Sequence, residues 1–337
     1  MKTILVAGAG GFIGGFLVKD LLAKGHIVRA VDIKPISDWY QVFSTADNIQ
    51  LDLKSLSSCR YAVKKRHGLE GFPNNGVDEV INLAADMGGM GFIETHKAEC
   101  MLSVLINTHL LMAAKEVGVK KFFYASSACV YAHDKQTDTN VVALKEADAY
   151  PAMAEDGYGW EKLFSERMCR HFMEDYKMEV RVARFHNVYG PKGTYSGGRE
   201  KAPAAICRKV IEAIQSGNHK IEIWGDGEQT RSFMYVDDCV EGIQKLMASD
   251  FHDPINLGRE DLISINQLVD IVENIANVKL TRSYKLDAPK GVRGRNSDNT
   301  LIKKVLGWEP SITMKQGMEK TYAWIYDEMT NPTRKQW

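Results

Sequence analysis

The sequence carries no excess charge of either sign and little proline. In 337 residues, 43 Lys plus Arg balance 43 Asp plus Glu, and nine residues are proline. Without net charge or a long basic block, the chain lacks the electrostatic footprint of proteins that bind nucleic acid or anionic membranes. It also lacks a run of about 18 uncharged apolar residues, the length that a membrane-spanning helix needs. We therefore predict neither a nucleic-acid partner nor a membrane partner.

Cysteine is sparse and scattered. The six cysteines stand at positions 59, 100, 129, 169, 207 and 239, and no two form a CxxC pair or another local metal-binding spacing. This pattern excludes a small disulfide-stapled fold. It predicts reduced thiols, no bound metal ion and a cytoplasmic location.

Short β-rich runs alternate with amphipathic helical stretches in the first half of the chain. The pattern predicts strands at 3–7, 27–32, 79–84, 121–126 and 179–185, and helices near 12–24, 95–117 and 158–176. Such alternation is typical of a parallel sheet covered by helices. After about residue 186 the regularity loosens, and further helices are expected at 202–216, 236–248, 264–277 and 314–329.

Glycines at the first strand-to-helix junction indicate a phosphate-binding turn. Gly8, Gly11 and Gly14 form GxxGxxG, where bare backbone amides and the helix dipole can hold a pyrophosphate. A plain glycine-rich turn is the alternative, but the preceding strand and following helix disfavour it. Phe12 and Ile13 complete the expected cofactor turn. The prediction is an α/β fold with a Rossmann-type doubly wound parallel sheet and a smaller C-terminal substrate-binding domain.

The second strand ends on a carboxylate that favours NAD over NADP. Asp32 lies 18 positions beyond Gly14, where it would accept hydrogen bonds from the adenosine ribose and repel a 2′-phosphate. Asp52 and Leu53 follow the next apolar stretch and could meet the adenine edge. A helix N-cap is an equally good interpretation of Asp52.

A tyrosine and a lysine share one face of the helix expected at 158–176. Tyr158 and Lys162 are four residues apart, so both side chains can reach one site. An ammonium group beside a phenol favours the phenolate and gives the tyrosine usable base strength. A surface i,i+4 pair is the alternative. Ser126 and Ser127 end a predicted strand about 30 residues earlier, which favours the catalytic interpretation.

Together with AsnLeuAlaAla (82–85), SerSer (126–127) and ArgPheHisAsnValTyrGlyPro (184–191), these motifs resemble the extended short-chain dehydrogenase/reductases that act on nucleotide sugars. The resemblance runs from residue 2 to about 327. Within that superfamily the sequence is most similar to the GDP-mannose 3,5-epimerases. The strings that carry this similarity are AspMetGlyGlyMetGlyPheIle (86–93), SerSerAlaCysValTyr (126–131), GlyGlyArgGluLysAlaProAlaAla (197–205) and GlyValArgGlyArgAsnSerAspAsn (291–299).

The resemblance implies a role for each matching residue. Tyr158 and Lys162 would be the redox pair, Ser127 would polarise the sugar, and Cys129 with Lys201 would be the acid/base pair. It also implies tightly held NAD, GDP-mannose as the substrate partner, Ala84 at the cofactor, and a homodimer formed by the helices near 95–117 and 158–176. The residues expected at the substrate are Gly88, Gly89, Met90, Ser127, Asn187, Glu200, Lys201, Lys209, Gln229, Arg231, Arg293 and Arg295.

Several of these candidates have plain structural alternatives. Cys129 at the end of an apolar strand could be a buried small hydrophobe, and Lys201 could be a solvated loop charge. Arg231 and either Arg293 or Arg295 are the cationic forks expected at the diphosphate, but each could form a surface salt bridge.

The implied reaction is NAD-dependent epimerisation at C3 and C5 through a transient 4-keto sugar, giving GDP-L-galactose and the C5-only product GDP-L-gulose. A nucleotide-sugar 4-epimerase or 4,6-dehydratase on the same scaffold stays open, as does a non-catalytic NAD-binding module. We assign residues 1–185 to the NAD-binding domain, with 230–250 packing back on it. Residues 186–330 form the nucleotide-sugar domain and 331–337 a tail.

Overall fold

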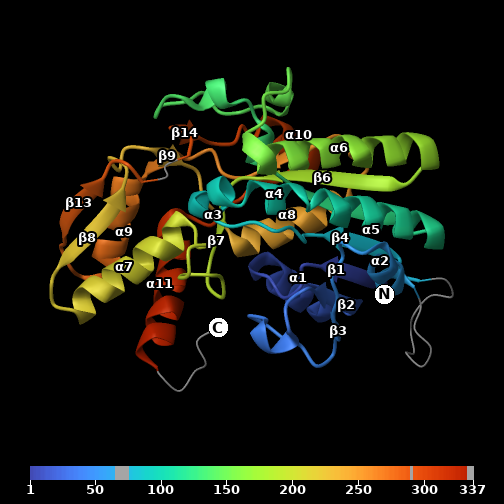
Figure 1. Cartoon of the computed structure of the whole chain (residues 1–337), viewed down its shortest axis with the longest axis horizontal. Helices are drawn as coiled ribbons and strands as arrows, with labels where there is room; N and C mark the ends of the chain where they lie inside the picture. The colour runs from blue at the N-terminus through green and yellow to red at the C-terminus, as the bar shows by residue number, and fades with distance from the viewer. Residues whose placement is uncertain (65–75, 289–290, 332–337) are drawn as a thin grey trace.

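A seven-stranded parallel sheet organises the first half of the protein. The computed structural model describes residues 1–64, 76–288 and 291–331, so the predicted tail beyond Asn331 lies outside the described residues. The strand order is β11-β6-β5-β4-β1-β2-β3 (Figure 1). The strands are β1 Thr3–Ala7, β2 Ile27–Asp32, β3 Asp47–Gln50, β4 Glu79–Asn82, β5 Lys121–Ser127, β6 Glu179–Phe185 and β11 Ile255–Leu257.

Helices cover both faces of this sheet (Figure 1). The first face carries α1 (Phe12–Ala23) and α8 (Val236–Ala248), and the second carries α2 (Leu56–Val63), α5 (Val104–Val117) and α6 (Asp156–Tyr176). Alternate residues of β1 point to opposite faces: Ile4 and Val6 join one hydrophobic cluster, whereas Leu5 and Ala7 join the other. Burial on both faces explains why these strands read as continuous apolar runs.

The predicted helix 95–117 is wrong as a single element. The structure has three helices here, α3 (Met90–Thr95), α4 (Lys97–Met101) and α5, with a turn at Leu102 and Ser103. The Ser103 hydroxyl accepts a hydrogen bond from the Asp86 backbone N–H at 2.9 Å. This contact fixes the turn to the segment that follows β4.

The stretch Lys97–Val117 is also long and apolar enough to fit a membrane span, by length and composition alone. In the structure, 44% of that stretch is buried inside the protein. Its α5 portion packs against α2 and α6. A helix buried in a protein core reaches the same hydropathy, so the observation is weak evidence for a membrane.

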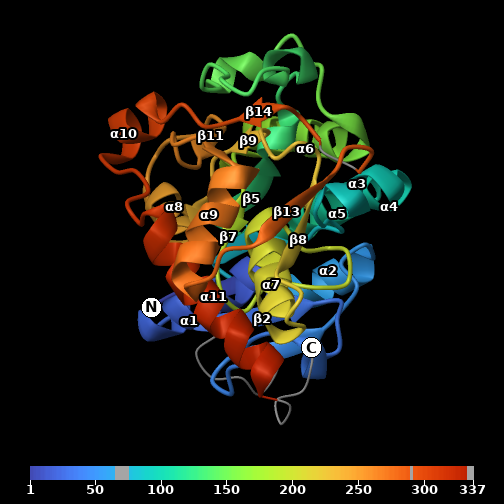
Figure 2. The same cartoon turned by 90° about the vertical axis from the view of Figure 1, so that its left-hand side faces the viewer.

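The second half is built from helices and small sheets. Figure 2 shows α7, α9 and α11 beside the pair of strands β8 and β13. The helices are α7 Ala202–Gln215, α9 Ile265–Ala276, α10 Thr300–Leu306 and α11 Met314–Thr330. The strands are β7 Val188–Tyr189 with β10 Met234–Tyr235, β8 Lys220–Trp224 with β13 Thr281–Lys285, and β9 Thr230–Arg231 between β12 Ile263–Ser264 and β14 Gly294–Arg295.

The two halves are interleaved along the chain. After β10 the chain returns to the first half, where α8 packs on α1 and β11 pairs with β6 at the sheet edge. It then leaves again to form α9 and the elements that follow. One hydrophobic cluster runs through both halves, with Leu17, Ile211 and Leu268 among its fully buried members.

Candidate active site

The turn between β1 and α1 has the shape of a dinucleotide cradle. Gly8 has a φ of +81°, and a Cβ there would lie 2.9 Å from the Ala84 backbone nitrogen. A Cβ at Gly14 would collide with the Gly8 carbonyl, so α1 starts directly on the turn. Gly11 is the N-cap of α1, and the N–H groups of Phe12 and Ile13 in the first helical turn have no intrahelical acceptor. These residues fit a bound pyrophosphate.

The strand ends next to this turn carry the groups expected at the adenosine. Asp32 ends β2, is buried, and accepts a hydrogen bond from the Lys34 backbone N–H at 3.0 Å. The Lys34 amine turns away to the Gly10 carbonyl, 2.6 Å distant, and burial lowers its pKa. The Asp32 carboxylate therefore has no side-chain ion pair with its nearest lysine, as ribose binding requires.

Asp52 is not a helix N-cap, because Ser55 caps α2. The Asp52 carboxylate instead accepts from the Lys54 backbone N–H at 2.9 Å, and the side chain stays exposed while Leu53 is buried. Ala84 follows β4 and donates its N–H to the Asn82 side chain at 3.1 Å.

The redox candidates meet at the carboxyl end of β5. Tyr158 and Lys162 lie on α6 with 6% and 3% of their surface exposed, and the Lys162 Nζ is 5.5 Å from the Tyr158 ring centre. The Tyr158 phenol hydrogen-bonds to Ser127, the last residue of β5. The fold therefore brings Ser127, Tyr158 and Lys162 together. The four-residue spacing of Tyr158 and Lys162 on one helix had predicted that these two share a site.

The surroundings of Tyr158 oppose the expected phenolate. Burial raises the pKa of Tyr158 well above its usual value, nearby Cys129 and Glu161 raise it further, and the Ser127 hydrogen bond opposes them. Glu161 was missed in the sequence. Its carboxylate lies 3.5 Å from the Lys162 Nζ and accepts from the Tyr124 hydroxyl at 3.1 Å. The i+3 spacing from Tyr158 was the signal that could have found it.

Cys129 lies in the 3-10 helix η2 (Ala128–Val130), directly after β5, and is 8% exposed. Three cationic side chains from the second half approach it. The Arg295 Nη1 donates to the Cys129 Sγ at 3.5 Å. Lys201 and Arg231 interact with the thiol electrostatically. Burial lowers the pKa of Lys201 and lowers the pKa of Arg231 to about 10.

Lys201 is the N-cap residue of α7, and its amine has no hydrogen-bond or ion-pair partner among the described residues. Lys201 is half-buried, and an amine that loses hydration without gaining a partner gives up its proton more readily than a fully solvated one. The expectation that Lys201 could be a solvated loop charge does not match this position.

Of the three arginines considered for the diphosphate, Arg231 interacts with the Cys129 thiol, and Arg293 and Arg295 have different positions. Arg295 is 6% exposed. It forms an ion pair with Glu155 and donates to the Gln136 side chain at 2.5 Å, and these contacts hold it next to Cys129. Arg293 is half-buried and pairs with Asp226 at 2.7 Å. The structure therefore places Arg295 beside Cys129, and its predicted contact with the diphosphate stays a prediction.

The loop at 88–90 faces the segment that carries Lys201. A Cβ at Gly89 would lie 2.5 Å from the Glu200 carbonyl oxygen, and one at Gly88 would lie 3.3 Å from the Arg199 Cα. These glycines thus allow close approach of two loops, whereas the sequence suggested close approach to a sugar. The Met90 side chain lies against Gly291, since a Cβ at Gly291 would be 3.1 Å from it.

The other predicted substrate residues make polar contacts around the same region. The Asn187 amide donates to the Ser232 carbonyl at 3.2 Å, and the Glu200 carboxylate accepts from the Gly198 N–H at 2.6 Å. The Gln229 amide donates to the Trp224 carbonyl at 2.7 Å, while its buried oxygen has no partner among the described residues. Such an oxygen is available to a ligand donor.

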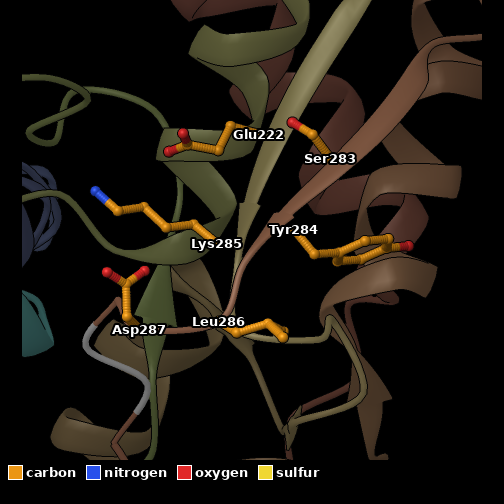
Figure 3. Close-up of a pocket in the computed structure, with 6 residues that line it drawn as sticks. All are labelled: Glu222, Ser283, Tyr284, Lys285, Leu286 and Asp287. Carbon is orange, nitrogen blue, oxygen red and sulfur yellow. The ribbon is translucent and has the colours of Figure 1, made fainter.

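A cavity of about 490 Å³ opens beside β8 and β13 (Figure 3). The Lys209 amine donates to the carbonyl of Glu222, one of the lining residues, at 2.8 Å. Lys209 is thus the predicted substrate residue that contacts the lining of this cavity. Its lining residues are Glu222, Ser283, Tyr284, Lys285, Leu286 and Asp287. In the described parts of the chain, no group of three or more His, Cys, Asp and Glu side chains is placed to hold a metal ion.

The parallel sheet, the glycine cradle and the Tyr158–Lys162 pair define a dinucleotide-dependent enzyme of Rossmann type. Residues 4–258 match the model of the NAD dependent epimerase/dehydratase family, and the chain belongs to that family. It is 45% identical over 327 residues to GDP-mannose 3,5-epimerase 1 of Oryza sativa subsp. japonica, an alignment that covers 97% of this chain and 82% of that protein. It is 43% identical over 333 residues to GDP-mannose 3,5-epimerase of Arabidopsis thaliana, covering 98% of this chain and 84% of the relative.

Solved structures agree on the fold. The UDP-glucose 4-epimerase of Thermotoga maritima, solved with UDP-glucose, superposes with a TM-score of 0.84 at 24% identity, covering 97% of this chain and 99% of that one. The predicted fold class, family and NAD dependence are thereby confirmed, and the protein is a nucleotide-sugar epimerase.

Proposed function

We propose that this enzyme inverts GDP-mannose at C3 and C5 through a 4-keto intermediate, giving GDP-L-galactose and, after inversion at C5 alone, GDP-L-gulose. One observation carries the proposal: the Cys129 thiol from the first half meets the Lys201 amine from the second half beside Ser127 and Tyr158. The identity of 45% to a GDP-mannose 3,5-epimerase supports the same assignment.

The residues divide the reaction into oxidation and inversion. Tyr158, held by Ser127, acts as a phenolate that the Lys162 ammonium stabilises; it accepts the proton of the C4 hydroxyl and becomes a neutral phenol. Bound NAD supplies the oxidant that takes a hydride from C4 and later returns it. The C4 carbonyl makes the C–H bonds at C3 and C5 acidic.

Inversion then needs one group that removes a proton and another that delivers one to the opposite face. Cys129 projects from the end of β5 and Lys201 from the start of α7, so the two groups approach from different elements. Arg295, which donates to the Cys129 Sγ at 3.5 Å, supplies positive charge where an enolate develops.

The residue types at positions 128 and 129 separate this proposal from its competitors. A 4,6-dehydratase would be expected to carry a carboxylate pair there, whereas this chain has Ala128 and Cys129. A 4-epimerase has no need for Lys201. A non-catalytic NAD-binding module would not be expected to keep Tyr158 and Lys162 buried together.

The decisive experiment is incubation with GDP-mannose in deuterated water, followed by NMR of the recovered sugar. The wild type should form the C3- and C5-inverted sugars with solvent deuterium at both carbons, and no free NADH should accumulate. Cys129→Ala should still oxidise C4 but lose inversion by a factor on the order of 10². Cys129→Ser tests the thiol at nearly constant size. Full inversion in both variants would mean that Cys129 only packs in the core and moves no proton. If the wild type left the sugar unchanged, the proposed function would be refuted.

We also propose that two copies associate through α5 and α6. Five large apolar side chains on α4–α6 and their connection are more than a third exposed, an unusual concentration for a monomer surface. They are Met101, Leu102, Leu105, Trp160 and Phe164. We further propose a cytoplasmic location, which the six free thiols support.

A further inference from the structure

Arg199 joins the two halves of the enzyme directly beside the reacting groups. Its guanidinium donates to the Asp86 carboxylate at 2.9 Å and to the Met87 carbonyl at 3.3 Å. It also lies 3.7 Å from the centre of the Phe92 ring, whose other face stacks on His96 at 4.2 Å. Its own carbonyl accepts from the Gly89 N–H at 3.0 Å.

The segment that bears Arg199 has one rigid end and one permissive end. Lys201 begins α7, and the Glu200 carboxylate ties the segment back to α7 through Arg208 at 3.3 Å. At the other end, Gly197 and Gly198 have φ values of +85° and +87°, with open space where a Cβ would be. Two such glycines place little restraint on the backbone.

The reacting groups are buried beside the loop on which this segment docks. Tyr158 and Cys129 are 6% and 8% exposed, and both pack in one cluster with Phe92. A hexose has to reach both side chains, which requires neighbouring segments to move apart while it enters. The segment 197–201 (the strap) crosses from the second half onto the loop 86–92 and ends at Lys201.

We infer that Arg199 is a positioning residue: it fastens the strap to Asp86 and Phe92 after the nucleotide sugar has entered, and this fixes the Lys201 amine opposite Cys129. The inference rests on the proposed function, since it presumes that Lys201 exchanges protons with the sugar. Arg199 transfers no proton itself. No hydrogen bond or ion pair joins Arg199 to Tyr158 or Lys162 in the described part of the chain, so its loss should affect inversion more than oxidation at C4.

The kinetic test separates oxidation from inversion in Arg199→Ala. A displacement of about 1 Å can cost on the order of 10² in rate, so deuterium incorporation at C3 and C5 should fall about 10- to 100-fold. Single-turnover reduction of bound NAD by GDP-mannose should stay within about twofold of wild type. Arg199→Lys keeps the charge but loses the planar fork, and should recover part of the exchange.

Arg170→Ala is the matched control. Arg170 is 45% exposed and forms surface ion pairs with Glu174 and Asp253, comparable to Arg199 at 47%. It should change neither step. Equal slowing of oxidation and inversion in Arg199→Ala, or wild-type exchange in that variant, would overturn the inference.

A second measurement needs no substrate and so distinguishes failure of the inference from failure of the proposed function. Asp86→Asn removes the ion pair but leaves every trypsin site in place. Exposed ion pairs contribute little, so trypsin should cut the Arg199–Glu200 bond about two- to fivefold faster in this variant. Unchanged cleavage would refute the strap contact even if GDP-mannose is turned over. Faster cleavage together with a wild type inert toward GDP-mannose would refute the proposed function, and with it the role in positioning Lys201.

Discussion

A buried histidine should make the stability of this enzyme fall steeply in mild acid. His186 follows β6 and has no exposed surface. Its Nε2 lies 3.1 Å from the Asn256 side-chain oxygen, so Nε2 carries the proton and donates it. The Nδ1 is buried without a partner among the described residues. Burial first, and then the charge of Arg184, lower the pKa of His186 to about 4, while the Asn256 hydrogen bond opposes them.

The sign follows from proton uptake in the two states. An unfolded histidine binds its proton near pH 6.5, whereas the folded one remains neutral until about pH 4. As the pH falls between these values, the unfolded state gains protons and the free energy of unfolding decreases. At about 1.4 kcal/mol per pKa unit, the loss is about 3 kcal/mol over the whole window and about 2 kcal/mol by pH 5.

The assay is equilibrium urea unfolding at pH 7 and pH 5, comparing the wild type with His186→Gln. Glutamine can still donate an amide N–H to Asn256 but does not titrate. The variant should lose about 2 kcal/mol less than the wild type between the two pH values, because the carboxylates common to both proteins cancel. Exposed His171→Gln is the control and should follow the wild type. Equal losses in wild type and His186→Gln would refute the reasoning.

Three further predictions concern the cofactor, the redox pair and assembly. Tyr158→Phe leaves no acceptor for the C4 proton, so NMR should show both inversions slowed together by a factor on the order of 10² or more; a rate close to wild type would mean that another base serves C4. Asp32→Ser removes the carboxylate that repels a 2′-phosphate and should raise the affinity for NADP relative to NAD in binding titrations; an unchanged ratio would remove Asp32 from the ribose site. Phe164→Glu puts a charge on a side chain that is 54% exposed and should yield monomers in sedimentation, whereas an unchanged mass would exclude this dimer surface.

Local patterns predicted the parts of the fold that depend on local chemistry. The glycine turn and the helix from Phe12 follow from backbone sterics and helix polarity, and they stand where the sequence indicated. The strand Asp47–Gln50 was not predicted, because three of its four residues are polar and only its pairing with β2 makes it a strand. The break at Ser103 depends on a contact with Asp86, which no helical periodicity shows.

In the candidate site too, local sequence patterns predicted some residue positions, whereas others depend on tertiary contacts. The spacing of Tyr158 and Lys162 on one helix was sufficient to bring them together. The position of Arg295 was not predictable, because its partners Gln136 and Glu155 are distant in sequence and become neighbours through the tertiary fold. Its contact with the Cys129 thiol therefore had no signal in the sequence.

The interleaving of the two halves bears on how the chain is made. The sheet gains its outer strand from Ile255–Leu257, and α8 covers the surface of α1. A nascent chain that has emerged from the ribosome only as far as β6 would leave that strand edge unpaired and one side of α1 bare. Both are surfaces that invite association with other chains. Translation must therefore pass Leu257 before the nucleotide-binding half can close, and chaperone protection would be needed longest in the interval between β6 and that residue.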